Sequence, residues 1–550
     1  MRSSGPTAFI VKIYQNRIIK VKYEALCDDQ ERKAYVSTRD RDHHLTGPLM
    51  FTTSMKRCCL SVLLCLLAAR VLGNSISGQV LDAETHLPLP FASISVMDSQ
   101  LGTISNSEGY FILSSQSILG TDTLLFSYMG YETLKRAIQD FEKSPLVYLR
   151  PVEINLDAVT VYSRQLTGRE IIGQVRENYS KNHPERSEMR RMFYHKFERT
   201  PFPEDNQIHV KHSDFVGMDK ATIEGLLKML PDEFTEYQDA VLSFYNDDDK
   251  HKLVPVEAIS LEEDAMQDLE AILEKKLSAF FEDIEKSKGN QEIYYKFRTG
   301  IFAMKADTNP DEDTGALEPH ADSLHYRVPT TQLDGEVSFL LKDYGSLKSD
   351  NWEFITKPNR YDYRMEEVTV FNGELVYQVA FTPRERGLFE GTLYVSTQSF
   401  AILQLDFAYA PGKTSEDIHL LGFGHSMNSK QGRVIFEKGK EGYFVKYIHA
   451  KQHETASIAR DFTIMKKQKR FLIDKELNEI KLEASLTFEI HSDWELLILD
   501  RKPLEANEFE TVKQPAVVRF RKEYSNAPDL WDNRTVIAPS AELTKYTRKE

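Results

Sequence analysis

Short runs of alternating apolar and polar residues dominate the chain between residue 75 and about residue 163. In the run FASISVMD at 91–98, serine residues alternate with aliphatic residues, so the two kinds of side chain would point to opposite faces of a strand. The run DTLLFSYMGY at 122–131 is a longer apolar run that ends in a turn at Gly130. About six to eight such runs, at roughly ten-residue spacing, are typical of an antiparallel β-sandwich. We therefore predict a sandwich domain over residues 74–163.

The stretch GTISNSEGYFIL at 102–113 places turn residues between two apolar runs. Asn106 can bond its own backbone, and Gly109 tolerates a left-handed conformation. We predict a hairpin loop at 106–109 with a scaffold role. Successive side chains of a strand point to opposite faces, and we expect Phe111 and Leu125 to lie inside the sandwich.

Residues 164–330 show helical spacing instead. TGREIIGQVRENYSKN at 167–182 spaces its apolar residues at helical intervals, with Thr167 as the N-cap. The segments 218–245 and 261–287 read as further amphipathic helices, the second with an apolar stripe of Met266, Leu269, Ile272, Leu273, Leu277 and Phe280. Its acidic residues indicate a solvated face, since no EF-hand pattern is present. This middle region would be α-rich, with an acidic loop at 306–323.

Strict alternation returns from residue 334 to about residue 492. Apolar residues alternate with polar ones at 375–381, 403–409, 443–447 and 480–490, and Asn372-Gly373 marks a two-residue hairpin turn. We predict an antiparallel β-meander within 331–550, with one apolar face, which curls around a core and has a half-barrel as one possible form. The helices of 165–290 should cover its apolar face, and Lys481 and Glu483 should point outward. The fold class is thus α+β, mainly β.

Residues 55–73 have the pattern of a secretory signal peptide. A short basic start at Met55 precedes an apolar run, and a small residue, Gly73, precedes the expected cleavage site. A transmembrane helix is disfavoured because the run is short and Arg70 interrupts it. We expect an exported chain that begins near Asn74, with 1–54 a non-native or disordered extension. The chain's four cysteines, which we expect cleavage to remove, are Cys27, Cys58, Cys59 and Cys65.

Composition narrows the classes of partner. The formal net charge of -15 argues against nucleic-acid binding through phosphate neutralisation. A hydrophobic content of 41% is enough for a sizeable packed core. No transmembrane segment is expected after signal cleavage.

Four stretches occur in the order SGQVLDAETHLPLPFASISV, GTISNSEGYFIL, DTLLFSYMGYET and LDAVTV. Together they resemble the carboxypeptidase-like regulatory domain, a transthyretin-like (prealbumin-like) sandwich that is common at the start of exported proteins of Bacteroidota-type bacteria. The resemblance implies a seven-stranded antiparallel sandwich and does not imply peptidase chemistry. A zinc carboxypeptidase needs His-x-x-Glu. His183, His212, His425 and His453 all lack the glutamate.

Other catalytic motifs are incomplete. Gly412-Lys413-Thr414 resembles the end of a phosphate-binding loop, but Phe407 stands where its first glycine is required. The glycine-rich stretch around His425 and Ser426 lacks Gly-x-Ser-x-Gly. Trp352, Trp494 and Trp531 are too few and too scattered for a sugar platform. We therefore expect no catalytic residue, no cofactor and no metal ligand.

Three classes of function remain open. The favoured one is a non-catalytic exported cell-envelope protein, periplasmic or outer-membrane associated, that binds or assembles with an unknown envelope protein, glycan or lipid. The second is a carrier of apolar or lipid-like ligands, because GTLYVSTQSFAILQLDF at 391–407 resembles a strand pair of periplasmic lipoprotein-carrier proteins. The third is an enzyme with an unrecognised site.

Overall fold

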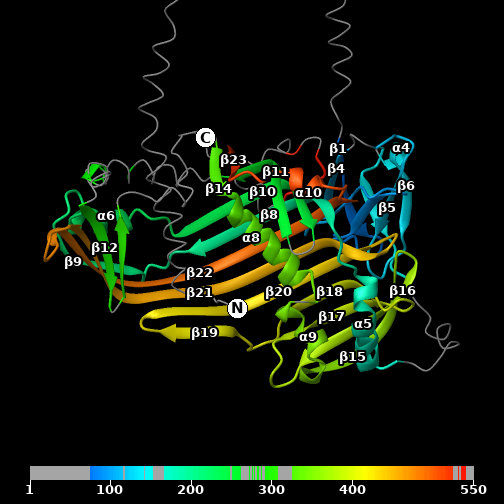
Figure 1. Cartoon of the computed structure of the whole chain (residues 1–550). Coiled ribbons are helices and arrows are strands. Elements are labelled where there is room, and N and C mark those ends of the chain that lie inside the picture. The colour runs from blue at the N-terminus through cyan, green and yellow to red at the C-terminus, as the bar shows by residue number, and fades with distance from the viewer. Residues whose placement is uncertain are drawn as a thin grey trace, which may run out of the picture.

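Figure 1 shows the computed structural model of the chain. It describes residues 75–152 except 115–117 and 142, then 166–247, 250–261, 292–300, 302–307, 325–347, 349–523, 531 and 534–540, and six isolated positions at 272, 276, 278, 282, 283 and 287. The predicted extension and signal peptide at 1–73 lie outside the described residues. So do most of the helix predicted at 261–287 and most of the acidic loop predicted at 306–323.

The N-terminal domain consists of two small sheets. One has the order β4-β1-β7, formed by Tyr110–Ser114, Ser75–Asp82 and Leu146–Leu149. The other has the order β3-β2-β5-β6, formed by Gly102–Ile104, Ser93–Val96, Thr123–Ser127 and Leu134–Ala137. Strands β1 and β7 pair in parallel, so the prediction of a wholly antiparallel sandwich is wrong for that pair.

An aromatic cluster fills the space between these two sheets. Phe111 is fully buried, and its ring contacts the rings of Phe126 and of Phe141 in α4 (Ile138–Phe141), each with centroids 5.7 Å apart. The prediction for Phe111 is therefore confirmed. Leu125 is only half-buried, whereas Leu124 and Phe126 are in the core. The prediction for Leu125 was wrong by one position, which in a strand exchanges the two faces.

The turn at 106–109 is not a hairpin loop as predicted. It joins β3 to β4, which belong to different sheets, so the chain crosses from one layer of the domain to the other. The predicted turn chemistry is nevertheless present. Asn106 Oδ1 accepts hydrogen bonds from the backbone N–H groups of Glu108 and Tyr110, both at 2.9 Å, and Gly109 has φ 78°. The residues of the turn itself determine its conformation. The strands with which β3 and β4 pair, by contrast, depend on distant residues.

One large sheet of sixteen strands makes up most of the remaining chain. Its main path runs β14-β23-β11-β10-β8-β22-β21-β20-β18-β17-β16-β15, with β9, β12, β13 and β19 beside it. In that order the bounds are His325–Pro329, Val517–Glu523, Lys250–Leu261, Glu233–Asp247, Glu188–Pro201, Lys475–Pro503, Gly442–Gln468, Phe423–Gly439, Ile402–Tyr409, Phe389–Ser396, Glu374–Pro383 and Tyr361–Phe371. The four other strands are Gln207–Ser213, Ile293–Thr299, Phe302–Asp307 and Ser415–Leu420.

The predicted C-terminal meander is part of this sheet. Strands β15 to β18 and β20 to β22 pair antiparallel with their neighbours along that path. Asn372 and Gly373 join β15 to β16 with φ of 52° and 75°, which is the predicted two-residue turn. The sheet has two open ends and is larger than predicted, because strands of the middle region extend it beyond β22.

The prediction of an α-rich middle region is wrong. The predicted helix at 218–245 is α6 (Lys220–Leu227) followed by strand β10, and β8 to β13 also lie in this region. Residues 237–242 of β10 are all buried, because Ala240 and Leu242 join the helix-covered core on one face and Val241 joins a second apolar cluster on the other. A strand covered on both faces loses its period-two alternation, so the pattern alone did not separate it from a helix.

Helices cover one face of the large sheet (Figure 1). The predicted helix is α5 (Gly168–Asn182), where Thr167 and Glu170 form a capping box and Ile171, Ile172 and Val175 enter the core. The rest of the cover was placed wrongly by the prediction. It comes from residues 330–356, in α8 (Thr330–Phe339), η3 (Leu340–Tyr344), η4 (Asp350–Trp352) and α9 (Glu353–Thr356), which pack buried side chains into the same core.

Candidate functional site

The face of the large sheet opposite the helices is polar where the N-terminal domain contacts it. In β18, Leu403, Leu405 and Phe407 point into the helix-covered core, and Gln404 and Asp406 alternate with them. Strand register continues this polar row into the neighbouring strands, with Asp406 opposite Arg433 of β20 and Arg433 opposite His449 of β21. We call this side the polar face.

An ion pair lies at the centre of this row. Arg433 Nε and Nη2 lie 2.6 and 3.2 Å from the two carboxylate oxygens of Asp406, and Gln404 Nε2 donates to Asp406 Oδ2 at 2.8 Å. Burial opposes the charge of Arg433, but the Asp406 carboxylate raises the pKa of the guanidinium above its usual value. The guanidinium and the carboxylate therefore hold each other in place through two parallel, charge-assisted hydrogen bonds.

Phe91 docks the N-terminal domain onto the polar face. The guanidinium carbon of Arg433 lies 4.8 Å from the centroid of the Phe91 ring, and the rings of Tyr447 and His449 lie 5.8 and 5.4 Å from it. Phe91 has φ 64°, which is unfavourable for a bulky residue. The domain thus presents this ring from a strained backbone position, held by the contacts on the sheet.

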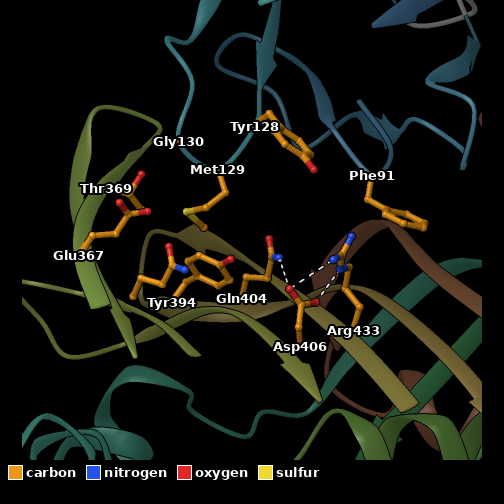
Figure 2. Close-up of a pocket in the computed structure, with 11 residues that line it drawn as sticks. Phe91, Tyr128, Met129, Gly130, Glu367, Thr369, Tyr394, Gln404, Asp406 and Arg433 are labelled. Carbon is orange, nitrogen blue, oxygen red and sulfur yellow. Dashed lines mark hydrogen bonds and ion pairs between the residues drawn. The ribbon is translucent and has the colours of Figure 1, made fainter. Parts of the chain in front are cut away.

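A pocket of about 160 Å³ lies beside this contact, between the domain and the sheet. Figure 2 shows Phe91 and Tyr128 of the domain on one side and Gln404, Asp406 and Arg433 of the sheet on the other. Its remaining lining residues are Met129, Gly130, Glu367, Thr369, Gln378 and Tyr394. Carboxylate, amide, hydroxyl and aromatic groups face one another here, a combination suited to a small polar ligand.

The backbone also fixes the two sides of the pocket. Gly130 N–H donates to the Val370 carbonyl of β15 at 2.9 Å, and Val152 N–H donates to the Gly130 carbonyl at the same distance. Gly130 has φ 83°, so the predicted turn residue is also a docking residue. Burial is the main cause that raises the pKa of Tyr128 above its usual value.

Residues 531 and 534–540, which we call the C-terminal clasp, hold the domain from a second side. Thr103 Oγ1 donates to the Val536 carbonyl at 3.0 Å, and Asn106 Nδ2 donates to the carbonyls of Ala538 and Pro539 at 3.2 and 3.0 Å. The predicted scaffold turn is thus a point of attachment. The clasp, the domain and the sheet share one apolar cluster, which includes Ile104, Tyr447 and Val536.

A second buried polar group lies under the clasp. Asp239 of β10 accepts hydrogen bonds from Tyr237 and Trp531 at 2.6 and 3.1 Å and lies 2.7 Å from Nδ1 of His195. Burial opposes the charge of His195, but the hydrogen bond and charge of Asp239, with Glu495 and Asp493 nearby, raise its pKa to about 9. The carboxylate is shared among three donors, which makes this a structural network.

The residues that the sequence singled out have separate surroundings, except that His183 and Trp352 both contact the rings of Tyr179 and Phe436. Lys413 Nζ donates to the Glu385 carbonyl at 2.8 Å in an exposed turn, and His425 lies 3.1 Å from Glu454. His183 is buried, and burial lowers its pKa to about 4. Trp352 lies in the core with its Nε1 bonded to the Tyr344 carbonyl.

One histidine has neighbours that the sequence search missed. His453 of β21 lies beside Glu489 and His491 of β22, with ligand atoms of all three within 4.8 Å of one another. These residues could hold a metal ion, whereas the sequence predicted no metal ligand. Their spacing along the chain follows no metal motif, because the register of two antiparallel strands brings them together. Only knowledge of that register would reveal the cluster.

Residues 469–475, from the end of β21 to the first residue of β22, form a second notable surface that we call the hairpin tip. Phe471, Leu472 and Ile473 are 100%, 87% and 83% exposed. Asp474 holds the base of the loop, since it accepts hydrogen bonds from the Arg470 N–H at 3.1 Å and the Tyr294 hydroxyl at 2.6 Å. A braced loop therefore presents three adjacent apolar side chains to solvent.

Comparison with known proteins identifies the N-terminal domain. Residues 76–161 match the family model described as CarboxypepD_reg-like domain, so this part of the chain is a carboxypeptidase-like regulatory domain, as predicted. No curated protein matches the chain. No helix among the described residues is long and apolar enough to cross a membrane.

Several solved structures show distant likeness. The crystal structure of MucB has 8% identity and a TM-score of 0.15, covering 58% of this chain and 92% of that one. The complex of Pseudomonas aeruginosa MucA and MucB has 8% identity and a TM-score of 0.15, with 61% and 100% covered. A DUF1329 family protein from Desulfovibrio piger has 10% identity and a TM-score of 0.14, with 62% and 96% covered. At these TM-scores the likeness carries no argument about function.

Proposed function

We propose that this chain, whose residues 76–161 carry a carboxypeptidase-like regulatory domain, is a non-catalytic exported envelope protein that serves as a binding or assembly scaffold at a membrane surface. The observation that carries the proposal is the hairpin tip. Three adjacent apolar side chains that are almost fully exposed are costly in water, and such a patch marks a site of contact with a membrane or another protein.

The charges around the hairpin tip favour an anionic bilayer. Lys469, Arg470 and Lys475 are exposed and flank the three apolar residues. Basic residues next to apolar ones are typical of segments that insert into the boundary between headgroups and acyl chains. The chain as a whole has a formal net charge of -15. An anionic surface would therefore attract the hairpin tip and repel the acidic body, which orients the protein.

The buried ionisable groups support a scaffold role. Asp406 is paired with Arg433 and also accepts from Gln404, and Asp239 is shared by three donors under the clasp. Asp239 holds Trp531 of the clasp, and Asp406 holds Arg433, whose guanidinium contacts Phe91 of the regulatory domain. A general base or nucleophile needs a free lone pair directed at substrate, and these groups direct theirs at protein donors.

Vesicle flotation tests the proposal. The purified chain from residue 74 onward should float with vesicles of phosphatidylglycerol and phosphatidylcholine, and less with phosphatidylcholine alone. The triple variant Phe471→Asp, Leu472→Asp, Ile473→Asp should lose at least nine-tenths of the floating fraction, because it places negative charge where apolar groups would insert. Exposed positions tolerate such changes without unfolding.

A second hairpin supplies the matched control. Ile418, Leu420 and Leu421, at the β19–β20 turn, are 47%, 64% and 51% exposed. Their triple aspartate variant should float as the parent chain does. No flotation of the parent chain, or equal losses for both variants, would overturn the proposal, since the second result would indicate general adhesion of exposed apolar residues.

A further inference from the structure

We infer that His453, Glu489 and His491 form a binding site for a borderline divalent transition-metal ion such as Zn²⁺ or Cu²⁺. The site lies on β21 and β22, between the docked regulatory domain and the hairpin tip. It goes beyond the proposed scaffold function and does not depend on it. The inference rests on the arrangement of two imidazoles and one carboxylate and on an unpartnered imidazole nitrogen.

Strand register places the three side chains on one face. His453 is directly opposite His491, and Glu489 precedes His491 by two residues, so its side chain points to the same side. The two imidazole rings are stacked, with centroids 4.1 Å apart and 13° between their planes. His453 Nε2 lies 3.9 Å from Glu489 Oε2. Two nitrogen ligands and one oxygen ligand therefore converge on one spot.

The distances suit a metal after small side-chain rotations. Ligand atoms of the three residues lie within 4.8 Å of one another. Bonds of about 2.0–2.1 Å from zinc to nitrogen or oxygen place two ligand atoms about 3.4 Å apart in a tetrahedral site. Rotation of the histidine and glutamate side chains can close this difference without moving the strands. Water would occupy the fourth position, since Glu489 is half exposed.

His453 Nε2 gives an independent reason to expect a ligand. This nitrogen is buried and has no hydrogen-bond partner. A buried polar atom without a partner is uncommon in folded proteins, and it often marks a place where an ion or water binds. A metal ion held between His453 and His491 would accept this lone pair.

A charged side chain of a neighbouring strand lies next to the cluster. Arg199 of β8 is directly opposite His491. Glu489 offsets the repulsion that Arg199 would exert on a cation.

The ligand set selects the class of metal. Imidazole nitrogen with one carboxylate suits Zn²⁺, Cu²⁺ or Ni²⁺, whereas Mg²⁺ and Ca²⁺ prefer sites made only of oxygen ligands. We therefore expect the chain to bind Zn²⁺ and Cu²⁺ and to ignore Mg²⁺ at the same concentration.

Isothermal titration of the purified chain with Zn²⁺ tests the inference. We expect one equivalent of Zn²⁺ to bind to the parent chain. The double variant His453→Ala, His491→Ala should bind Zn²⁺ at least tenfold more weakly. Glu489→Gln should weaken binding less, and its exposed position keeps the fold intact. Electron paramagnetic resonance of the chain with one equivalent of Cu²⁺ should show coupling to two nitrogens, which the double variant should lose.

His209 and His212 supply the matched control, because they are exposed histidines on β9 of the same sheet. The double variant His209→Ala, His212→Ala removes as many imidazoles and should bind Zn²⁺ like the parent chain. The inference fails if the parent chain binds no Zn²⁺, or if both double variants bind it with equal affinity. Circular dichroism of each variant establishes that the fold is kept, and if the alanine variant is unfolded, Glu489→Gln and the Cu²⁺ spectrum decide.

Discussion

The ring of Phe91 stacks on the ring of Tyr447, with 5.8 Å between the centroids and 29° between the planes. Phe91 belongs to the regulatory domain and Tyr447 to β21, so this contact joins two parts of the chain that have separate cores. The Tyr447 hydroxyl is in turn hydrogen-bonded to Glu495 of β22. The docking contact is therefore built into the hydrogen-bonded polar face.

Replacement of Phe91 by alanine should loosen the regulatory domain without unfolding it. The variant loses the contacts with Arg433, Tyr447 and His449, while the core around Phe111 is untouched. Hydrogen exchange should become faster in peptides that cover 91–105 and 433–449. Leu87→Ala, at an exposed position of the same domain, is the control and should leave exchange unchanged. Unchanged exchange in Phe91→Ala would show that Phe91 does not hold the domain.

Replacement of Phe111 by alanine should destabilise the regulatory domain itself. Phe111 is fully buried between the two sheets, and removal of a buried phenylalanine side chain costs about 3–5 kcal/mol. Urea unfolding of residues 74–163, which we expect to fold alone, measures this loss. Tyr110→Ala, on the exposed side of the same strand, should change the free energy of unfolding by about 0.5 kcal/mol or less. Comparable losses in both variants would contradict the assigned faces.

Stability should fall as pH rises through the range in which His195 titrates. Its pKa in the folded chain is about 9, above the value of about 6.5 expected for an unfolded chain. The folded state binds more protons between these values, so the contribution is complete below pH 6.5 and is lost as pH rises through 9. The difference corresponds to at most about 3.4 kcal/mol. Urea unfolding at pH 6 and pH 9.5 measures this change in the free energy of unfolding. In the variant His195→Gln the free energy of unfolding should depend less on pH.

Replacement of Asn106 should release the C-terminal clasp. Asn106→Ala loses the two bonds to the Ala538 and Pro539 carbonyls and the two bonds that shape its own turn. The unsatisfied buried groups should cost about 1–3 kcal/mol. Asn106→Asp keeps the side-chain oxygen that accepts the turn hydrogen bonds but loses the amide N–H groups that donate to the clasp. It therefore tests the contacts with the clasp separately from the turn. Faster hydrogen exchange at 534–540 in both variants is expected, and normal exchange in Asn106→Asp would count against the clasp.

The sequence predicted best what depends on neighbouring residues. The helix at 167–182 has its cap at Thr167, and its apolar residues recur at helical spacing, so both its start and its buried face were predictable. The turn at Asn372-Gly373 was predictable because its conformation needs only those two residues. The alternation in β18 likewise placed Leu403, Leu405 and Phe407 in the core.

What depends on distant residues escaped prediction. Strand β10 is buried on both faces, and its sequence alone did not indicate which parts of the chain would cover those faces. His453 and His491 meet only because β21 and β22 pair in one particular register. Phe91 looked like an ordinary member of a short strand, and nothing in its sequence context indicated that its ring would leave the domain and dock on β21.

The clasp also constrains the order in which the protein can assemble during translation. The regulatory domain has its own core and can form early, but Thr103 and Asn106 must wait for residues 536–539 to be synthesised. Until then Ile104, which the finished molecule buries against the clasp and sheet, has no cover. Nascent chains expose such surfaces to aggregation, and contacts of long sequence separation form slowly. Closure of residues 534–540 over the regulatory domain therefore cannot precede the synthesis of those residues.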